Sequence, residues 1–266
     1  MSLEKLVVLS SDDKDSTSNS NSDFVVSLKE SYYTQNVLKV MIKDIIVPNA
    51  FPNIRGSDYG SSQNNQFVIT DGVTPYFALV PEGQYVISTL GPPPANDLLT
   101  VLKGLIDTAI FPNTVTITLD PITNKLSFTF SAGNYNFVTS EVSNMNDVLG
   151  ITGPDTGLTN PLVAQSIPDL SGYDMVYIHS RNLAEANAID GDFGLISVAE
   201  GISLVDAPYG SYAYRQNNDS QLSTVLYDNP RNLNRIRIVL RDVKGNKLDT
   251  GTLKITVIFK VILASG

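Results

Sequence analysis

Two segments near the C-terminus alternate apolar and other residues with a period of two. In residues 235–241, positions 236, 238 and 240 are Ile, Ile and Leu, while positions 235, 237 and 241 are Arg. In residues 252–261, every odd position is Leu, Ile, Val or Phe. Successive side chains of a strand point to opposite faces, so both segments are predicted strands with one covered and one more open face. Residues 242–251 form the turn between them.

The rest of the chain is also dominated by strand-like segments. Counted together they give roughly ten strands, bounded by turn residues and long irregular connections. The one convincing helix covers residues 96–109, with Leu98, Leu102, Leu105 and Ala109 on one face and Asn96 as its N-cap. This inventory predicts an all-β fold, either a β-sandwich or a jelly roll.

The middle of the sequence differs from its flanks. Residues 76–152 combine a strand, the helix, a hairpin and a short anchoring turn, so we expect a subdomain inserted into the sandwich. Residues 1–75 and 153–266 then form the jelly-roll scaffold. Residues 10–23 of the scaffold contain no apolar side chain and cannot bury themselves. They are either a surface loop or an arm that reaches a neighbouring subunit.

Composition excludes several classes of function. The formal net charge is −9, and no block of basic residues provides a phosphate-binding stripe, so we expect no direct nucleic-acid binding. There is no cysteine, which excludes disulfides, zinc–thiolate sites and thiol nucleophiles. No apolar run is long enough to span a membrane, and the N-terminus lacks the features of a signal peptide.

No catalytic, cofactor or metal site is expected. His179 is the only histidine and lies at a predicted strand end, where a structural role is the commoner one. Asp190-Gly191-Asp192 resembles a fragment of a calcium loop, but the remaining oxygen ligands are missing. No Gly-rich phosphate loop is present. We therefore expect a chain that is not an enzyme and needs no cofactor.

Two groups of residues are candidates for a subunit interface. Arg235, Arg237 and Arg241 share one face of a strand and repel one another unless carboxylates meet them. Those carboxylates come either from local Asp and Glu residues or from an acidic neighbouring subunit. Tyr209, Tyr212 and Tyr214 are likewise either loop packing or part of an interface patch.

Several stretches, in order along most of the chain, resemble one family of viral proteins. The stretches are VLSSDDKDSTSNSNSDFVVSL at 8–28, PEGQY at 81–85, the helix at 96–109, TVTITLDPITNKL at 114–126, VLG at 148–150, YIHSRNL at 177–183, ISV at 196–198, PYG at 208–210, NPRNL at 229–233 and IRIVLRDVKGN at 236–246. This set is similar to the vertex (penton) and minor capsid proteins of virophages, polinton-like viruses and related large DNA viruses.

The resemblance implies a structural role in a virion. It implies a jelly-roll penton protein that forms homopentamers at icosahedral vertices, contacts the major capsid protein and is assembled inside the host cell. Other minor capsid proteins or a receptor are further candidate partners. The alternative function is a carbohydrate-binding or receptor-binding β module of a viral fibre or lectin type, in which exposed tyrosines stack on sugar rings. A β-sandwich hydrolase would need a converging carboxylate pair, and the sequence singles out none.

Overall fold

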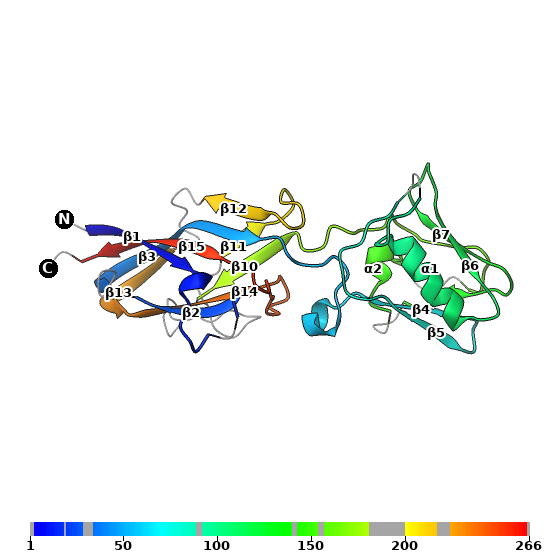
Figure 1. The fold of residues 1–266 in the computed structure, drawn as a ribbon, viewed down its shortest axis with the longest axis horizontal. Helices are drawn as coiled ribbons and strands as arrows, with labels where there is room; N and C mark the ends of the chain where they lie inside the picture. The colour runs from blue at the N-terminus through cyan, green and yellow to red at the C-terminus, as the bar shows by residue number, and fades with distance from the viewer. Residues whose placement is uncertain are drawn as a thin grey trace. The chain divides into compact units, whose positions relative to one another are not determined.

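The chain folds into two compact units. The computed structural model (Figure 1) describes residues 3–18, 20–28, 34–88, 92–139, 143–153, 157–180, 200–216 and 224–264. One unit consists of Met1–Phe51 and Tyr173–Gly266, and the other of Pro52–Gly172. The first unit, built from both ends of the chain, is called the jelly-roll unit below, and the second is called the inserted unit.

The first sheet of the jelly-roll unit has the strand order β1-β15-β3-β12, with β13 also paired to β3. All pairings are antiparallel. The strands are β1 (Leu3–Ser10), β3 (Thr34–Pro48), β12 (Tyr212–Gln216), β13 (Thr224–Leu233) and β15 (Thr256–Leu263).

The second sheet has the order β11-β10-β14-β2 and is also antiparallel. Its strands are β2 (Asp23–Ser27), β10 (Met175–His179), β11 (Glu200–Ser203) and β14 (Arg235–Arg241). Leaving β13 aside, the first, eighth, third and sixth strands of this unit form one sheet. The second, seventh, fourth and fifth form the other. This is the strand order of an eight-stranded jelly roll, so the predicted fold class is confirmed.

The alternating patterns in the sequence identify the inner faces of the two sheets. In β15 every second residue from Val257 to Leu263 is buried, and in β14 Ile236 and Ile238 are fully buried. Their buried neighbours on the adjacent strands include Val7, Leu9, Phe24, Val26, Val176 and Ile178. The long strand β3 does not alternate perfectly because its register against β15 shifts between Ile258 and Phe259, which leaves Lys43 as an extra residue.

In its described residues the inserted unit contains two small sheets, two α-helices and the 3₁₀ helix η3 (Ser57–Ser62). One sheet has the order β5-β4-β8 and the other β6-β7-β9. The strands are β4 (Gln66–Thr70), β5 (Pro75–Leu79), β6 (Val115–Leu119), β7 (Leu126–Phe130), β8 (Asn136–Phe137) and β9 (Leu162–Val163). The helices are α1 (Leu98–Ala109) and α2 (Asn146–Leu149).

Aromatic packing joins the two small sheets. The rings of Phe67 and Phe128 stack with centroids 5.7 Å apart, and Phe137 meets Phe128 edge-on at 5.4 Å. Helix α1 buries Leu98, Leu102 and Ile106 in the same core. The inserted unit therefore has a hydrophobic core of its own.

Helix α1 begins one residue later than the sequence suggested. Its N-cap is Asp97, whose carboxylate accepts hydrogen bonds from the backbone N–H and the hydroxyl of Thr100. Asn96, the expected cap, instead donates its side-chain N–H to the carbonyl of Gln84. The expected Leu105 is only partly buried, and Ile106 takes its place in the core.

The inserted unit is longer at both ends than the expected insertion of residues 76–152. Its strand β4 pairs with β5 and β8, which ties residues 66–70 to this unit rather than to the jelly roll. At the other end β9 pairs with β7. The jelly-roll unit accordingly keeps less of the chain than the expected segments 1–75 and 153–266.

Candidate interaction surfaces

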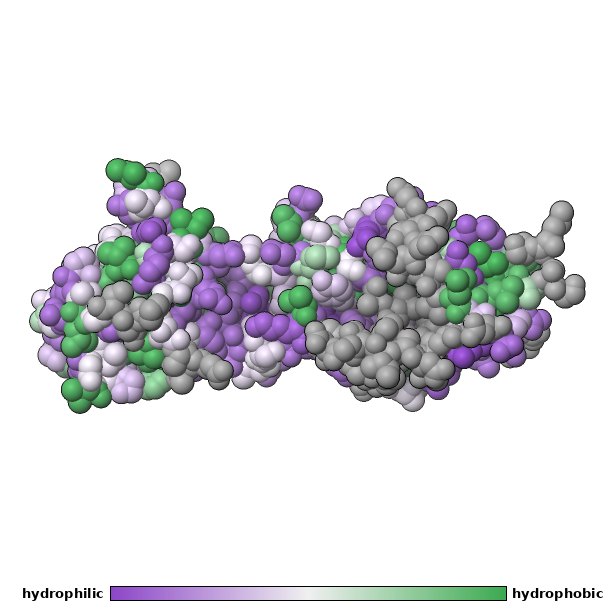
Figure 2. All heavy atoms as spheres, turned by 180° about the vertical axis from the view of Figure 1, so that it is seen from behind, coloured by the Kyte–Doolittle hydropathy of each residue, from purple (hydrophilic) through white to green (hydrophobic). Residues whose placement is uncertain are grey.

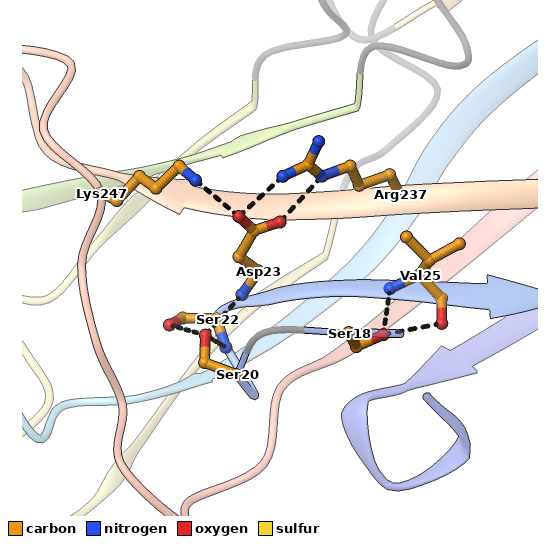
Figure 3. Close-up of polar contacts among 7 residues, drawn as sticks. All are labelled: Ser18, Ser20, Ser22, Asp23, Val25, Arg237 and Lys247. Carbon is orange, nitrogen blue, oxygen red and sulfur yellow. Dashed lines mark hydrogen bonds and ion pairs between the residues drawn. The ribbon is translucent and has the colours of Figure 1, made fainter. Parts of the chain in front are cut away.

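The arginine-bearing face of β14 meets carboxylates of the same chain (Figure 3). Arg237 forms two parallel hydrogen bonds of 2.8 Å to the Asp23 carboxylate, which also accepts a 2.7 Å hydrogen bond from Lys247. Asp23 is buried, and its burial alone would raise its pKa. The hydrogen bonds and positive charges of Arg237 and Lys247 outweigh burial and lower the pKa of Asp23 to about 2.

The other two arginines also have partners within the chain. Arg235 reaches Asp15 at 3.0 Å, in a pair that is largely exposed on the arginine side. Arg241 donates to the carbonyl of Gly245 in the turn after β14. Of the two interpretations of this face, the geometry matches the one with local Asp neighbours, and no acidic partner subunit is needed to neutralise Arg235 or Arg237.

Part of the polar run 10–23, residues 11–18, lies against the outer edge of β2. It starts with the 3₁₀ helix η1 (Ser11–Asp13), and the Asp15 N–H then donates to the carbonyl of Val25. The hydroxyl of Ser18 accepts from the Val25 N–H and donates to the Val25 carbonyl, as Figure 3 shows. Asp15 also accepts from the N–H and hydroxyl of Ser27. Asp15 and Ser18, which belong to no strand, thus occupy backbone hydrogen-bonding groups that the edge strand β2 would otherwise expose.

Unlike the edge of β2, the edge of β1 is not covered by other described residues of the chain. This strand lies at the edge of its sheet, and within the described part of the chain only β15 pairs with it. Val7 and Leu9 point into the core, yet the outward positions also carry apolar residues: Leu6 is 62% exposed and Val8 is 56% exposed. A solvated strand face normally carries polar residues, so this apolar edge is a candidate contact surface.

The apolar edge continues onto the neighbouring strand. Ile258 lies opposite Val8 and Lys260 opposite Leu6, and Lys260 pairs with Glu4 at 3.2 Å. Figure 2 shows hydrophobic residues gathered on the jelly-roll unit toward the end where β1, β13 and β15 lie. We call Leu6, Val8 and Ile258 the β1 patch.

The three tyrosines expected as packing or interface residues are all exposed. Tyr209 is 52% exposed, Tyr212 47% and Tyr214 60%. Tyr212 and Tyr214 lie on β12, and the hydroxyl of Tyr214 donates to Asp44 at 2.9 Å. Tyr212 and Tyr214 also line a groove beside β11, whereas Tyr209 does not. They are therefore available for contact with another molecule.

Of the groups considered for catalysis or metal binding, the structure describes His179 but not Asp190 and Asp192. His179 is 9% exposed and lies opposite Val239 at the end of β10. Among the described residues no three His, Cys, Asp or Glu side chains converge to hold a metal ion. Asp190-Gly191-Asp192 lies outside the described residues. No helix in the described segments is both long and apolar enough to cross a membrane.

Sequence reasoning missed the carboxylates that pair with the arginines. Asp15 and Asp23 lie in or next to a run of Ser, Asp and Asn whose composition predicts only solvated loop. The one usable signal was the position of Asp23 at the start of β2, because a strand that pairs with β14 brings it beside Arg237. Glu200, the buried partner of Arg215, gave no signal, since it lies within an otherwise ordinary apolar stretch and begins β11.

Similarity to known proteins is found at the level of structure. No protein-family model and no curated protein matches the sequence. The jelly-roll assignment rests on the strand order of this chain. The chain is similar in structure to the selenomethionine-labelled mavirus penton protein, with 11% sequence identity, coverage of 100% of both chains and a TM-score of 0.49.

Proposed function

We propose that this chain is a structural capsid protein that forms the icosahedral vertex as a homopentamer and contacts the major capsid protein around it. The observation that carries the proposal is the jelly-roll strand order, because it unites the segments that resemble penton proteins. Residues 8–28 continue from β1 through η1 into β2, and residues 236–246 form β14 and its following turn. Segments from both ends of the sequence thus build one scaffold.

The surface of the jelly-roll unit is better suited to subunit assembly than to the catalytic turnover of a substrate. A ring of identical subunits needs two different surfaces on each copy, one complementary to the other. The β1 patch supplies one candidate, since Leu6 and Val8 point outward from an edge strand. The β2 edge is less suited, because residues 15–18 already bond to it. A stable contact of this kind buries roughly 1,200–2,000 Å² in total.

The arginine face has a different role in this proposal. Arg237 is engaged by Asp23 within the chain, which supports a role in stabilising the jelly-roll unit. Tyr209, Tyr212 and Tyr214 remain candidates for contact with other molecules, because all three are exposed.

Native mass spectrometry of the purified chain tests the proposal. We expect a discrete species at five times the chain mass of 28.8 kDa. The Leu6→Lys variant keeps an exposed position exposed, and we expect it to remain folded and run as a monomer. Ile122→Lys is the matched control, because Ile122 is also highly exposed but lies in the inserted unit. A wild-type dimer or hexamer would contradict the pentamer, and pentamers of Leu6→Lys would contradict the role of the β1 patch.

A further inference from the structure

The first sheet of the jelly-roll unit ends on both sides in a strand edge that has no partner strand among the described residues. On one side β1 pairs only with β15. On the other side β12 and the start of β13 pair only with β3. Such edges present backbone N–H and C=O groups that can pair with a strand of another molecule.

The second sheet does not offer the same pair of edges. Its β2 edge already exchanges hydrogen bonds with Asp15 and Ser18 of the same chain. A contact that repeats from copy to copy around a ring needs two different surfaces on each subunit, one complementary to the other. Within the described part of the chain, the first sheet meets this requirement with its two unpaired edges.

The directions of the two edges are compatible with such a ring. Strand β1 is antiparallel to β15, β15 to β3 and β3 to β12, so β1 and β12 run in opposite directions. A rotation about an axis roughly parallel to the strands keeps these directions. It therefore brings β1 of one copy beside β12 of the next as an antiparallel pair, the more stable of the two kinds of ladder.

Both edges carry apolar or aromatic side chains on the same face of the sheet. Ala213 of β12 is buried, so its neighbours Tyr212 and Tyr214 point to the outer face, where both are exposed. On β1 the outward positions are Leu6 and Val8. The same rotation keeps the outer faces aligned, so these side chains become cross-strand neighbours when the edges pair. Aromatic and aliphatic pairs of this kind stabilise a sheet.

The lengths of the two edges are also similar. Tyr212 lies opposite Pro48 of β3, and Leu226 of β13 lies opposite Lys39. The edge formed by β12 and the start of β13 therefore follows β3 from residue 48 to residue 39, over roughly 33 Å. Strand β1 has 8 residues and extends over roughly 26 Å. Leu226 is 68% exposed and continues the outward row of the two tyrosines.

We propose that β1 of one copy pairs with the β12–β13 edge of the next, which joins the first sheets of the ring into one continuous sheet. This inference rests on the proposed homopentamer and identifies the surface that receives the β1 patch. A pairing of β1 with β1 would instead join two copies about a twofold axis. It would leave the β12 edge of both copies unused and could not build a ring.

Disulfide trapping tests the pairing, because the chain contains no cysteine and every cross-link comes from an introduced pair. Residues directly opposite each other in an antiparallel pair have Cα atoms about 4.5–5.5 Å apart, within the range of disulfide bonds. Registers that keep the outer faces aligned differ by two residues, so a small panel covers them. The panel combines Leu6→Cys or Val8→Cys with Tyr212→Cys, Tyr214→Cys or Leu226→Cys.

The controls are the single variants and one further double variant. Leu6→Cys with Ser203→Cys is the matched control, because Ser203 is exposed on β11, an edge of the second sheet. After mild oxidation, we expect at least one panel variant to give a ladder of covalent species that ends at five times the chain mass of 28.8 kDa. All controls should stay at the mass of one chain. Native mass spectrometry of wild type decides the pentamer separately.

Hydrogen–deuterium exchange keeps the test decisive if a cysteine variant does not assemble. The backbone amides of β12 should exchange at least about tenfold more slowly in the wild-type pentamer than in monomeric Leu6→Lys. A wild-type pentamer with neither a ladder nor this protection would overturn the edge pairing and leave the proposed function standing. Covalent dimers of Leu6→Cys or Val8→Cys alone, or a ladder confined to the Ser203 control, would also overturn it. A wild type that stays monomeric would overturn both.

Discussion

Replacing Asp23 by Asn removes the charge that Arg237 and Lys247 both bind, while the shape of the side chain is kept. The pKa of Asp23 is about 2 in the folded chain, against roughly 3.9 in an unfolded chain. Each unit of pKa difference corresponds to about 1.4 kcal/mol, so the charged form contributes on the order of 2 kcal/mol at neutral pH. The hydrogen bond to Asp23 raises the pKa of Arg237, but this is the same contact, so it adds no further free energy of unfolding.

The sign of the pH dependence follows from the lowered pKa. A carboxyl with a lower pKa in the folded state stabilises the fold above its unfolded pKa, and this contribution is lost as pH falls through the folded value. The difference in unfolding free energy between wild type and Asp23→Asn should therefore be fully present above about pH 5 and should shrink between about pH 4 and pH 2.

Urea unfolding at pH 7 and pH 3, followed by circular dichroism, measures this difference. At pH 7 we expect Asp23→Asn to lose about 2 kcal/mol of unfolding free energy, which lowers Tm by roughly 4–8 °C. Asp13→Asn is the matched control, since Asp13 is exposed in the same polar run, and its change should stay within about 0.5 kcal/mol. Equal stability of Asp23→Asn and wild type at pH 7, or a difference that does not change with pH, would refute the reasoning.

Two further substitutions test the inserted unit. Asp97→Ala removes the N-cap of α1 and should lower the unfolding free energy by about 1 kcal/mol, measured by thermal unfolding; no change would mean that another group caps the helix. Gly150→Ala should be strongly destabilising, because Gly150 has φ of +74° and an added Cβ would lie 2.3 Å from the carbonyl oxygen of Ser166. Its control is Gly104→Ala in α1, where an added Cβ meets no atom within 4 Å; this change should stabilise by about 0.5–1 kcal/mol. A Gly150→Ala chain as stable as wild type would contradict the close approach.

The parts of the fold predicted correctly from the sequence are those that local periodicity determines. Alternation over 235–241 corresponds to β14, and the hairpin expected within 76–152 corresponds to β6 and β7. The extent of α1 followed from its apolar spacing. The prediction of Asn96 as the cap was wrong, because Asn and Asp are both favoured there and only the backbone geometry selects Asp97.

The parts that the sequence did not predict depend on non-local pairing. The sequence of β4 predicts a short strand but not the unit to which it belongs. Only its pairing with β5 and β8 assigns residues 66–70 to the inserted unit. The Asp23–Arg237 contact joins residues 214 positions apart. The groove beside Tyr212 forms because β11 and β12 end different sheets on the same side of the sandwich, a relation that no local pattern contains.

Electron cryo-microscopy of capsid particles in which this chain is co-assembled with a major capsid protein tests the proposed role most directly. If the chain forms the vertex, density that fits its jelly-roll unit will appear at the fivefold axes and at no other position in the capsid. Particles whose fivefold positions are filled by another protein, or in which this chain lies between the major capsid subunits, would contradict the vertex role.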